Sequence, residues 1–290
     1  MQAPLAQGGG RNHVSGMSMI AHLPDRCVVA VEGPDRVAFL QGLVSNDVEQ
    51  AAPGRAVWAA LLSPQGKWLA DFFILADGER LLLDVECLQA AMIVQKLTRF
   101  RLRSKVTLAA LPEWQVHVAW GGALEVAPGV VAAADPRLAE AGWRVLAPFA
   151  LATTAPVEAW DAHRLALGLP EGSRDLESDK TVLLEAGFDE LSGVSWSKGC
   201  YMGQELTART KYRGLIKRRL VPVVVEGALP APGTPVLRAD GVEVGTLRSG
   251  QGAAALATLR LDSLGAARDC GGARLVPRPP AWMRLPEGIG

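Results

Sequence analysis

The chain has 290 residues, of which 49% are hydrophobic and 21% charged, and its 30 basic side chains balance 30 acidic ones. A chain of this length predicts two or three domains rather than one core. The zero net charge removes the general electrostatic argument for a nucleic-acid or membrane-surface protein, so any anion site must be local. No stretch approaches the roughly 20 apolar residues that a membrane span needs.

The cysteines are four, Cys27, Cys87, Cys200 and Cys270, and they are widely spaced without a C-x-x-C pair. This spacing argues against a zinc ribbon, a self-contained iron–sulphur site or a disulfide framework, and it favours a cytoplasmic, reducing setting. The four histidines show no ligand-like spacing either, so no permanently bound metal is expected. Residues 1–21 lack the apolar core of a signal peptide and are predicted to be a disordered tail or to follow an upstream start codon.

Short apolar runs separated by turn residues dominate the first 120 residues. A buried strand is expected at 27–31, followed by a helix after Gly33-Pro34-Asp35. Further elements are expected in this order: antiparallel hairpins from 56–62, 68–75 and 81–85, a helix over 86–99, and strands at 105–111 and 116–120. Because these elements lack the regular rhythm of a doubly wound sheet, the predicted class is α+β.

The second half of the chain changes character near residue 219. Before that point we expect a connection over 127–141, a strand at 143–147, a helix over 156–167 and a long surface loop over 171–195, of a kind that is often functional. Beyond it, short strands are expected at 220–225, 236–238, 242–247, 255–261 and 274–277. They predict a small C-terminal β-barrel over 220–290, after an α+β region over 22–219.

Reactive groups are densest between Trp196 and Gly214. If Gly203 leads into a helix from Gln204 to about Tyr212, Glu205 lies at the positive helix end and can pair with Arg209 one turn later. Gly214 is then a natural left-handed cap. Local rules alone therefore specify this helix.

Cys200 would lie just before the N-terminus of that helix, beside Lys198. Unpaired backbone N–H groups and a nearby cation both favour a thiolate, which indicates a reactive or ligand-accepting sulphur. The structural alternative is that Gly199 and Gly203 merely permit a tight turn and Cys200 fills a small pocket. Residues alone leave both interpretations open.

Six bases and no acid lie between Arg209 and Arg219, which makes a local positive face in a neutral chain. A solvated helix end explains such a run, and so does an anion site for phosphates, RNA or the carboxylates of a ligand tail. Trp196, Tyr201 and Tyr212 add flat surfaces on which a ring could stack. An RNA-binding module is therefore kept as a weaker alternative.

The stretch from Lys198 to Glu205 reads K-G-C-Y-M-G-Q-E and resembles the K-G-C-Y-x-G-Q-E signature of the YgfZ family. That family comprises tetrahydrofolate-binding proteins related to the T-protein of the glycine cleavage system and to a mitochondrial iron–sulphur assembly factor. Further matching segments, in the family's order, are 33–36, 39–43, 45–47, 64–67, 103–106 and 164–170. The resemblance covers about residues 23–265.

The resemblance implies intertwined α+β domains around a central cavity that binds a reduced folate, plus a C-terminal β-barrel. It also implies a role in making or maintaining iron–sulphur enzymes, including enzymes that modify tRNA. Gly199, Tyr201, Gly203, Gln204, Glu205 and Arg209 are the motif positions that it marks as a ligand region.

One departure from the relatives concerns catalysis. The T-proteins carry paired acids at the end of the hairpin after a G-G turn, whereas this sequence reads Gly66-Lys67-Trp68-Leu69-Ala70-Asp71, so that only Asp71 remains. We therefore expect a monomeric, cytoplasmic accessory factor without direct nucleic-acid binding, whose functional thiol is Cys200. Its expected partners are a reduced folate and iron–sulphur assembly proteins or client enzymes. The alternative is a folate-dependent one-carbon transferase or demethylase in which Asp71 would orient or deprotonate the substrate.

Overall fold

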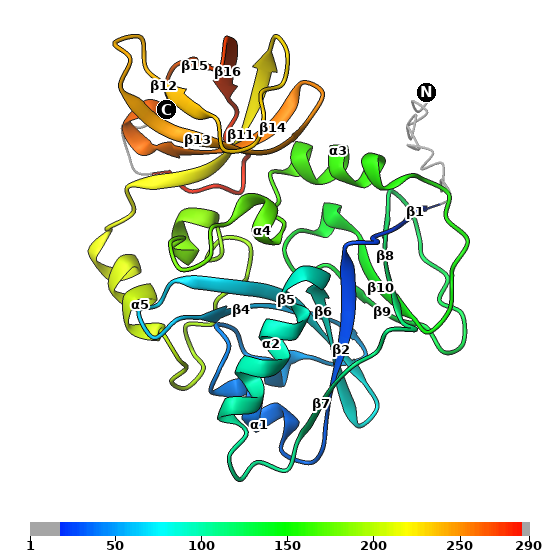
Figure 1. The fold of residues 1–290 in the computed structure, drawn as a ribbon. Coiled ribbons are helices and arrows are strands. Elements are labelled where there is room, and N and C mark those ends of the chain that lie inside the picture. Colours follow the sequence, from blue (N-terminus) through cyan, green and yellow to red (C-terminus); the bar gives the residue numbers. More distant parts are fainter. Residues whose placement is uncertain (1–17, 286–290) are drawn as a thin grey trace, which may run out of the picture.

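The first of three β-sheet units is an antiparallel sheet with strand order β4-β5-β6-β2-β7. This computed structural model describes residues 18–285 (Figure 1). The strands of the sheet are β2 (Arg26–Glu32), β4 (Val57–Leu62), β5 (Trp68–Asp77), β6 (Arg80–Glu86) and β7 (Thr107–Ala110). Its helices are α1 (Arg36–Gln41) and α2 (Cys87–Phe100). The predicted strand, hairpins and helices of this region are confirmed.

The second sheet has the order β1-β8-β10-β9-β3 and draws strands from both halves of the α+β region. Its strands are β1 (Met19–His22), β3 (Gly54–Arg55), β8 (Gln115–Trp120), β9 (Val131–Ala134) and β10 (Trp143–Ala147). Because β1 and β3 flank β2 in the sequence yet pair in the other sheet, the chain crosses between the sheets. The expected intertwined α+β architecture is confirmed in this form.

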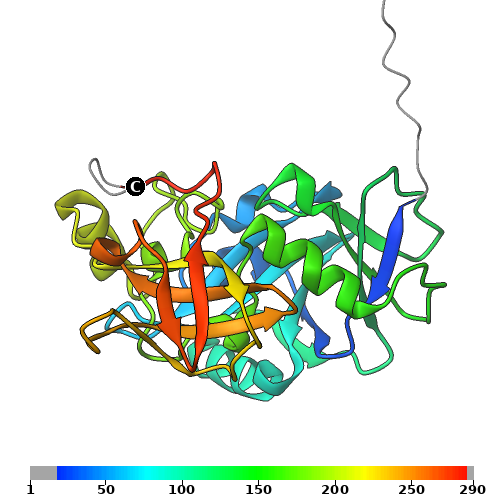
Figure 2. The same ribbon diagram turned by 90° about the horizontal axis from the view of Figure 1, so that it is seen from above.

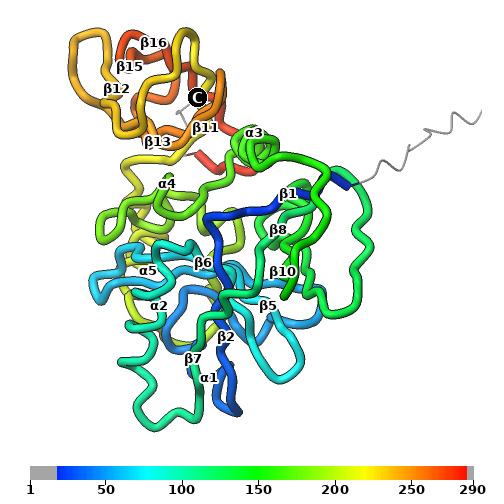
Figure 3. Tube along the Cα trace, turned by 45° about the vertical axis from the view of Figure 1, so that its right-hand side comes forward, coloured from blue at the N-terminus to red at the C-terminus, as the bar shows by residue number. Residues whose placement is uncertain are grey.

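The C-terminal unit is a closed barrel with the order β11-β14-β13-β12-β15-β16. Its strands are β11 (Arg218–Glu226), β12 (Pro235–Leu237), β13 (Glu243–Gln251), β14 (Ala254–Arg260), β15 (Arg268–Cys270) and β16 (Ala273–Pro277). Helices α3 (Val157–Leu167) and α4 (Gly172–Asp175) lie between the barrel and the two sheets (Figures 1 and 3). Seen from above, the barrel and the second sheet lie on opposite sides of the molecule (Figure 2).

Some predicted boundaries are wrong. Of the predicted tail, residues 1–17 lie outside the described part of the chain, but Met19–His22 is strand β1, and Ala21 is fully buried. The expected connection over 127–141 contains β9, and β15 was not predicted. These strands are only three or four residues long, too short to show a period in the sequence.

The segment 171–195, predicted to be a surface loop, is largely core. Besides α4 it contains a 3-10 turn over Leu183–Ala186. Its buried apolar side chains are Leu176, Leu183, Leu184, Ala186, Phe188, Leu191 and Val194. Asp175 is buried as well, because Arg164 donates to its carboxylate at 2.9 Å. The segment is irregular without being exposed.

Cys27 and Cys87 form a disulfide, with a Cα–Cα distance of 4.9 Å. The bond joins β2 to the first residue of α2 across 60 positions of sequence. The expectation from cysteine spacing, which argued against a disulfide framework, was therefore wrong for this pair. No helix of residues 18–285 is long and apolar enough to cross a membrane.

A buried network of arginines and carboxylates connects the two sheets. On β6, Asp84 accepts from Arg26 of β2 at 2.6 Å and from Arg144 of β10 at 3.3 Å. Arg144 also lies 3.5 Å from Asp135, which pairs with Arg137 at 2.7 Å. Burial alone would raise the pKa of Asp135, but Arg137 and Arg144 hold that pKa below its usual value.

His117 is a buried histidine without a hydrogen-bond partner among residues 18–285. It lies on β8 opposite His22 of β1, with 5.1 Å between the ring centroids, and is 1% exposed. Burial, assisted by His22, lowers its pKa from 6.5 to about 4. The imidazole is therefore neutral in the folded protein at neutral pH.

This burial predicts acid sensitivity. Above pH 6.5 His117 is neutral in both states, whereas between pH 6.5 and 4 the unfolded chain binds a proton that the folded chain excludes. The free energy of unfolding should fall over this range by up to about 3 kcal/mol from this group. His117→Leu should flatten that part of the pH dependence, which urea denaturation at several pH values measures. An unchanged slope would contradict the assignment.

Candidate functional site

The cysteine motif, Lys198–Glu205, ends in the first residues of helix α5 (Gln204–Arg213). Gly203 at its start and Gly214 at its end have φ values of 80° and 60°, in the left-handed region where a side chain is unfavourable. The backbone N–H of Gly214 is directed to the carbonyl groups of Thr210 and Lys211. The predicted helix and its glycine cap are confirmed.

The start of α5 packs directly on the turn between β4 and β5. A β-carbon built on Gly203 would lie 2.7 Å from the carbonyl oxygen of Ser63 and 3.0 Å from the Cα of Gly66. One built on Gly66 would lie 2.6 Å from both the carbonyl oxygen of Gly203 and the Cβ of Leu206. The turn at Gly66 and the cysteine motif at Gly203 are thus in direct backbone contact, which only glycine at both positions permits.

Cys200 lies in the segment Ser197–Gly203, which we call the thiol loop. Its side chain is a free thiol and is exposed, in contrast to the buried thiol of Cys270 in the barrel. Gly199 is exposed too, and no atom lies within 4 Å of a β-carbon built on it. The alternative in which Cys200 fills a small pocket therefore does not describe this structure.

Lys198 anchors the thiol loop. Its ammonium group donates to the carbonyl oxygens of Val44 and Asn46, each at 2.8 Å, and lies 5.1 Å from the ring centroid of Tyr201. Burial lowers the pKa of Lys198 to about 8, although Asp47 acts in the opposite direction. These contacts direct the ammonium group to the 44–47 segment. The sequence had led us to expect it beside Cys200.

Tyr201 and Gln204 close the loop onto the helix. The side-chain oxygen of Gln204 accepts from the N–H of Tyr201 at 3.4 Å, and the N–H of Gln204 donates to the Tyr201 carbonyl at 3.2 Å. Burial raises the pKa of Tyr201 to about 12, with a smaller opposing effect of Thr207. These two motif positions therefore shape the loop.

The segment before the thiol loop is held by two polar residues that sequence reasoning did not single out for a role. The Ser45 hydroxyl donates to the carbonyl of Gly193 at 2.7 Å, and the Asn46 amide donates to the carbonyls of Trp58 and Ser192 at 2.8 and 2.7 Å. Ser45 and Asn46 lie in one of the family-like segments, which was the only sequence signal for them.

Two of the six bases between Arg209 and Arg219 form ion pairs within the structure. Lys211 pairs with Asp189 at 3.0 Å and lies over Trp196, and Arg219 is buried against Glu190 at 2.8 Å. The bases left exposed are Arg209, Arg213, Lys217 and Arg218. Glu205 is exposed as well, and the expected Glu205–Arg209 pair is not among the ion pairs of residues 18–285.

Asp71, the residue of the transferase alternative, lies away from the thiol loop's contacts and inside the core. It is 3% exposed, and its two carboxylate oxygens accept from the indole N–H groups of Trp58 at 2.9 Å and Trp68 at 3.0 Å. Burial raises its pKa, although Arg26 opposes this. Trp58 also stacks on Phe188 with 4.0 Å between centroids, so aromatic rings fill the space around the carboxylate.

Comparison with known proteins identifies the family of this chain. The human mitochondrial iron–sulfur cluster assembly factor IBA57 is 36% identical over 270 residues, which cover 82% of this chain and 76% of the human protein. Its counterpart in Mus musculus is 33% identical over 88% of this chain and 81% of the mouse protein. The chain belongs to the IBA57 family. Its residues 217–285 match the C-terminal β-barrel domain of CAF17.

This chain also shares its fold with an enzyme of known structure. The glycine cleavage aminomethyltransferase T from Bartonella henselae superposes with a TM-score of 0.71 over 93% of this chain and 87% of that enzyme. The two sequences are only 15% identical, so the likeness concerns the fold alone. The predicted relation to the mitochondrial assembly factor is confirmed, and the YgfZ assignment itself stays a prediction.

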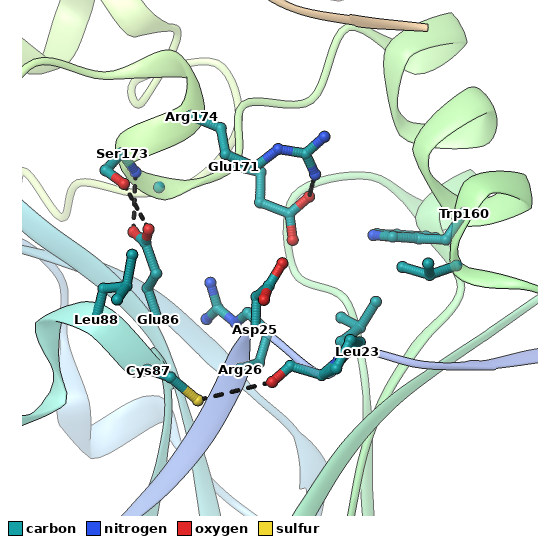
Figure 4. A pocket seen from close by; sticks show the side chains of 13 residues that line it. Leu23, Asp25, Arg26, Glu86, Cys87, Leu88, Trp160, Glu171, Ser173 and Arg174 are labelled. Atoms are coloured by element: carbon teal, nitrogen blue, oxygen red, sulfur yellow. Dashed lines mark hydrogen bonds and ion pairs between the residues drawn. The ribbon is translucent and has the colours of Figure 1, made fainter.

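Two cavities border these elements. An open cleft of about 780 Å³ runs beside the thiol loop, between segments 46–57 and 189–197. A more enclosed pocket of about 370 Å³, which we call the central pocket, lies between the start of β2, the start of α2, α3 and segment 171–174 (Figure 4). Within residues 18–285, no three or more histidine, cysteine or acidic side chains gather into a metal-holding group.

The glycine contacts predict opposite effects for two substitutions in the same motif. Gly203→Ala should lower the free energy of unfolding by about 3 kcal/mol, because the left-handed φ and the contact with Ser63 both oppose a β-carbon. Gly199→Ala should change it by less than about 0.5 kcal/mol. Denaturant unfolding of both variants measures the difference, and equal losses would contradict the assigned packing.

Proposed function

We propose that this protein is an accessory factor for the assembly or repair of iron–sulphur clusters, and that Cys200 is its functional thiol. The observation that carries the proposal is an exposed free thiol on a loop anchored at both ends, in a chain whose relatives are named iron–sulfur cluster assembly factors. The loop is held by Lys198 on one side and by the Gly66–Gly203 contact on the other.

A single thiolate can supply one ligand of the four that a cluster usually takes from cysteines. The other free thiol in the described chain, Cys270, is buried in the barrel. A cluster or sulphur species handled by Cys200 must therefore be held mainly by a partner, an assembly protein or a client enzyme. Exposure fits such an intermolecular step, whether it is ligation, thiol exchange or redox chemistry.

The transferase alternative is less well supported. Its acid, Asp71, is 3% exposed and accepts from two indole N–H groups in a packed core, so a substrate amine has no open access to the carboxylate. The RNA-binding alternative is weakened because Lys211 and Arg219 form ion pairs within the protein and are not free to contact phosphates. Both arrangements favour the accessory role.

Cys200→Ala should abolish the ability of the protein to restore iron–sulphur enzyme activities in a strain that lacks it, while the variant remains folded because the side chain is exposed. Cys270→Ala is the matched control and should complement as the wild type does. The measurement is growth together with iron–sulphur enzyme activity in extracts. Full complementation by Cys200→Ala would remove this thiol from the mechanism.

We also propose that the chain binds a reduced folate, which the resemblance implies. The central pocket suits it in size, because about 370 Å³ lies within the range of small-molecule sites. It also suits a pterin ring in chemistry, since apolar surface from Leu23 and Val157 lies beside the charged side chains of Asp25 and Glu171. When bound, a reduced folate supplies a carrier for one-carbon units, and the residues of the pocket would bind and orient it.

Calorimetry should therefore show heat of binding with 5-formyltetrahydrofolate and with polyglutamylated tetrahydrofolate. Cys200→Ala should bind them as the wild type does, because the thiol loop does not line the central pocket. Absence of heat with every reduced folate would overturn this proposal without touching the role of Cys200.

A further inference from the structure

The connection between α2 and β7 carries a cluster of bases that the functional site does not use. We call its residues 99–105, which read R-F-R-L-R-S-K, the basic tip. The segment contains no acid, and its four bases, Arg99, Arg101, Arg103 and Lys105, are all exposed. The connection lies at the end of the molecule opposite the barrel (Figures 1 and 3). The basic tip is therefore a local positive surface in a chain of zero net charge.

Two apolar side chains of the basic tip are in contact with water. Leu102 is 90% exposed and Phe100 is 36% exposed. Leu102 has a φ of 40°, in the left-handed region that leucine rarely adopts. The turn around it is closed by the N–H of Ser104, which donates to the carbonyl of Arg101 at 2.7 Å. The leucine side chain thus stands out from the molecule instead of packing onto it.

The charges of the basic tip are not neutralised within the described chain. None of its four bases forms an ion pair with an acid of residues 18–285. The half-buried carboxylate of Asp35 accepts from the backbone N–H of Lys105 at 2.7 Å, and the charge of Arg36 next to it offsets its own. Glu32, on the adjoining strand, lies 3.9 Å from Arg80. An anionic surface would therefore meet the charge of all four bases.

These features favour an anionic lipid surface over other occupants. A second copy of the chain would bring like charges together. Protein interfaces are depleted of charged residues at their centre, whereas here each apolar side chain has a base on both sides. RNA phosphates would engage the bases but would leave Leu102 in water. Bases combined with exposed apolar residues are typical of segments that lie between lipid headgroups and acyl chains.

We propose that the basic tip is a membrane-surface contact that binds the protein reversibly to bilayers containing anionic phospholipids. Leu102 enters the boundary between headgroups and acyl chains, with Phe100 beside it, and the four bases pair with lipid phosphates. Each base near an anionic leaflet contributes about fivefold to the partition coefficient. Attachment by a few bases and one leucine is reversible, unlike that of a membrane-spanning helix. The contact goes beyond the accessory role and does not depend on Cys200.

Co-sedimentation of the full chain with vesicles of equal parts phosphatidylglycerol and phosphatidylcholine measures the partition coefficient. The wild type should bind these vesicles at about 0.1 M salt but not vesicles of phosphatidylcholine alone. Raising the salt to about 0.5 M should weaken binding at least about fivefold, because the screening length shortens. A wild type that stays in the supernatant with the anionic vesicles would overturn the proposal. Retention on polyuridylate or polyglutamate instead would assign the basic tip to RNA or to an acidic protein.

Two variants test the basic tip with little risk to the fold. Leu102→Asn removes the apolar group from an exposed position, and asparagine adopts the left-handed conformation more readily than leucine. It should lower the partition coefficient at least about tenfold. The double variant Arg101→Gln, Arg103→Gln should lower it about 25-fold. Vesicle binding that neither variant weakens would show that another surface is responsible and would overturn the assignment.

Matched controls lie in the C-terminal unit. Val242→Asn removes an apolar side chain that is 44% exposed, and the double variant Arg278→Gln, Arg284→Gln removes two exposed bases. Both controls should leave the partition coefficient unchanged, and circular dichroism with thermal unfolding verifies that all four proteins are folded. A loss as large as that of the tip variants would mean that binding follows net charge rather than the basic tip, which would also overturn the proposal.

Discussion

The constraint on which most of this structure depends is the buried carboxylate of Asp84. It lies on β6 of the first sheet and accepts from Arg26 of the same sheet and Arg144 of the second sheet, so it joins two sheets whose strands are interleaved along the chain. Removing one member of a buried ion pair leaves an uncompensated charge and typically costs about 3–5 kcal/mol. The same bonds hold Arg26 at the wall of the central pocket, so sheet packing and pocket shape depend on one residue.

Arg164 plays the corresponding role at the barrel. From α3 it contacts Asp175 of α4 at 2.9 Å and the hydroxyl of Ser249 on β13 at 2.9 Å, and it also pairs with Glu171. One side chain therefore fixes the barrel against the α+β region and orients a carboxylate of the pocket. The thiol loop is held differently, by close approach of backbones at Gly66 and Gly203, which charge substitutions in the network should not disturb.

Features set by neighbouring residues could be predicted from the sequence, and features set by distant partners could not. Helix α5 follows from Gly203, Gly214 and the residues between them, and the hairpins of the first sheet follow from their turn residues. The segment 171–195 was misassigned because its acids suggested solvent, whereas their arginine partners lie elsewhere in the chain. The Cys27–Cys87 bond and the central pocket are likewise made by segments far apart in sequence, and no local pattern indicates them.

The environment of Asp71 bears on the proposed chemistry. The chain has the fold of an aminomethyltransferase, yet only Asp71 remains of the acid pair that T-proteins carry, and its carboxylate accepts from the indole groups of Trp58 and Trp68. A desolvated acid that is hydrogen-bonded to two buried indole groups is part of the packed core. Buried polar atoms without a partner among residues 18–285 include the indole N–H of Trp160 at the central pocket and the hydroxyl of Tyr201 in the thiol loop, and the exposed thiol of Cys200 lies on that same loop. The described chain combines a pocket with one exposed thiol, and the cluster chemistry proposed for that thiol needs a partner to supply the remaining ligands.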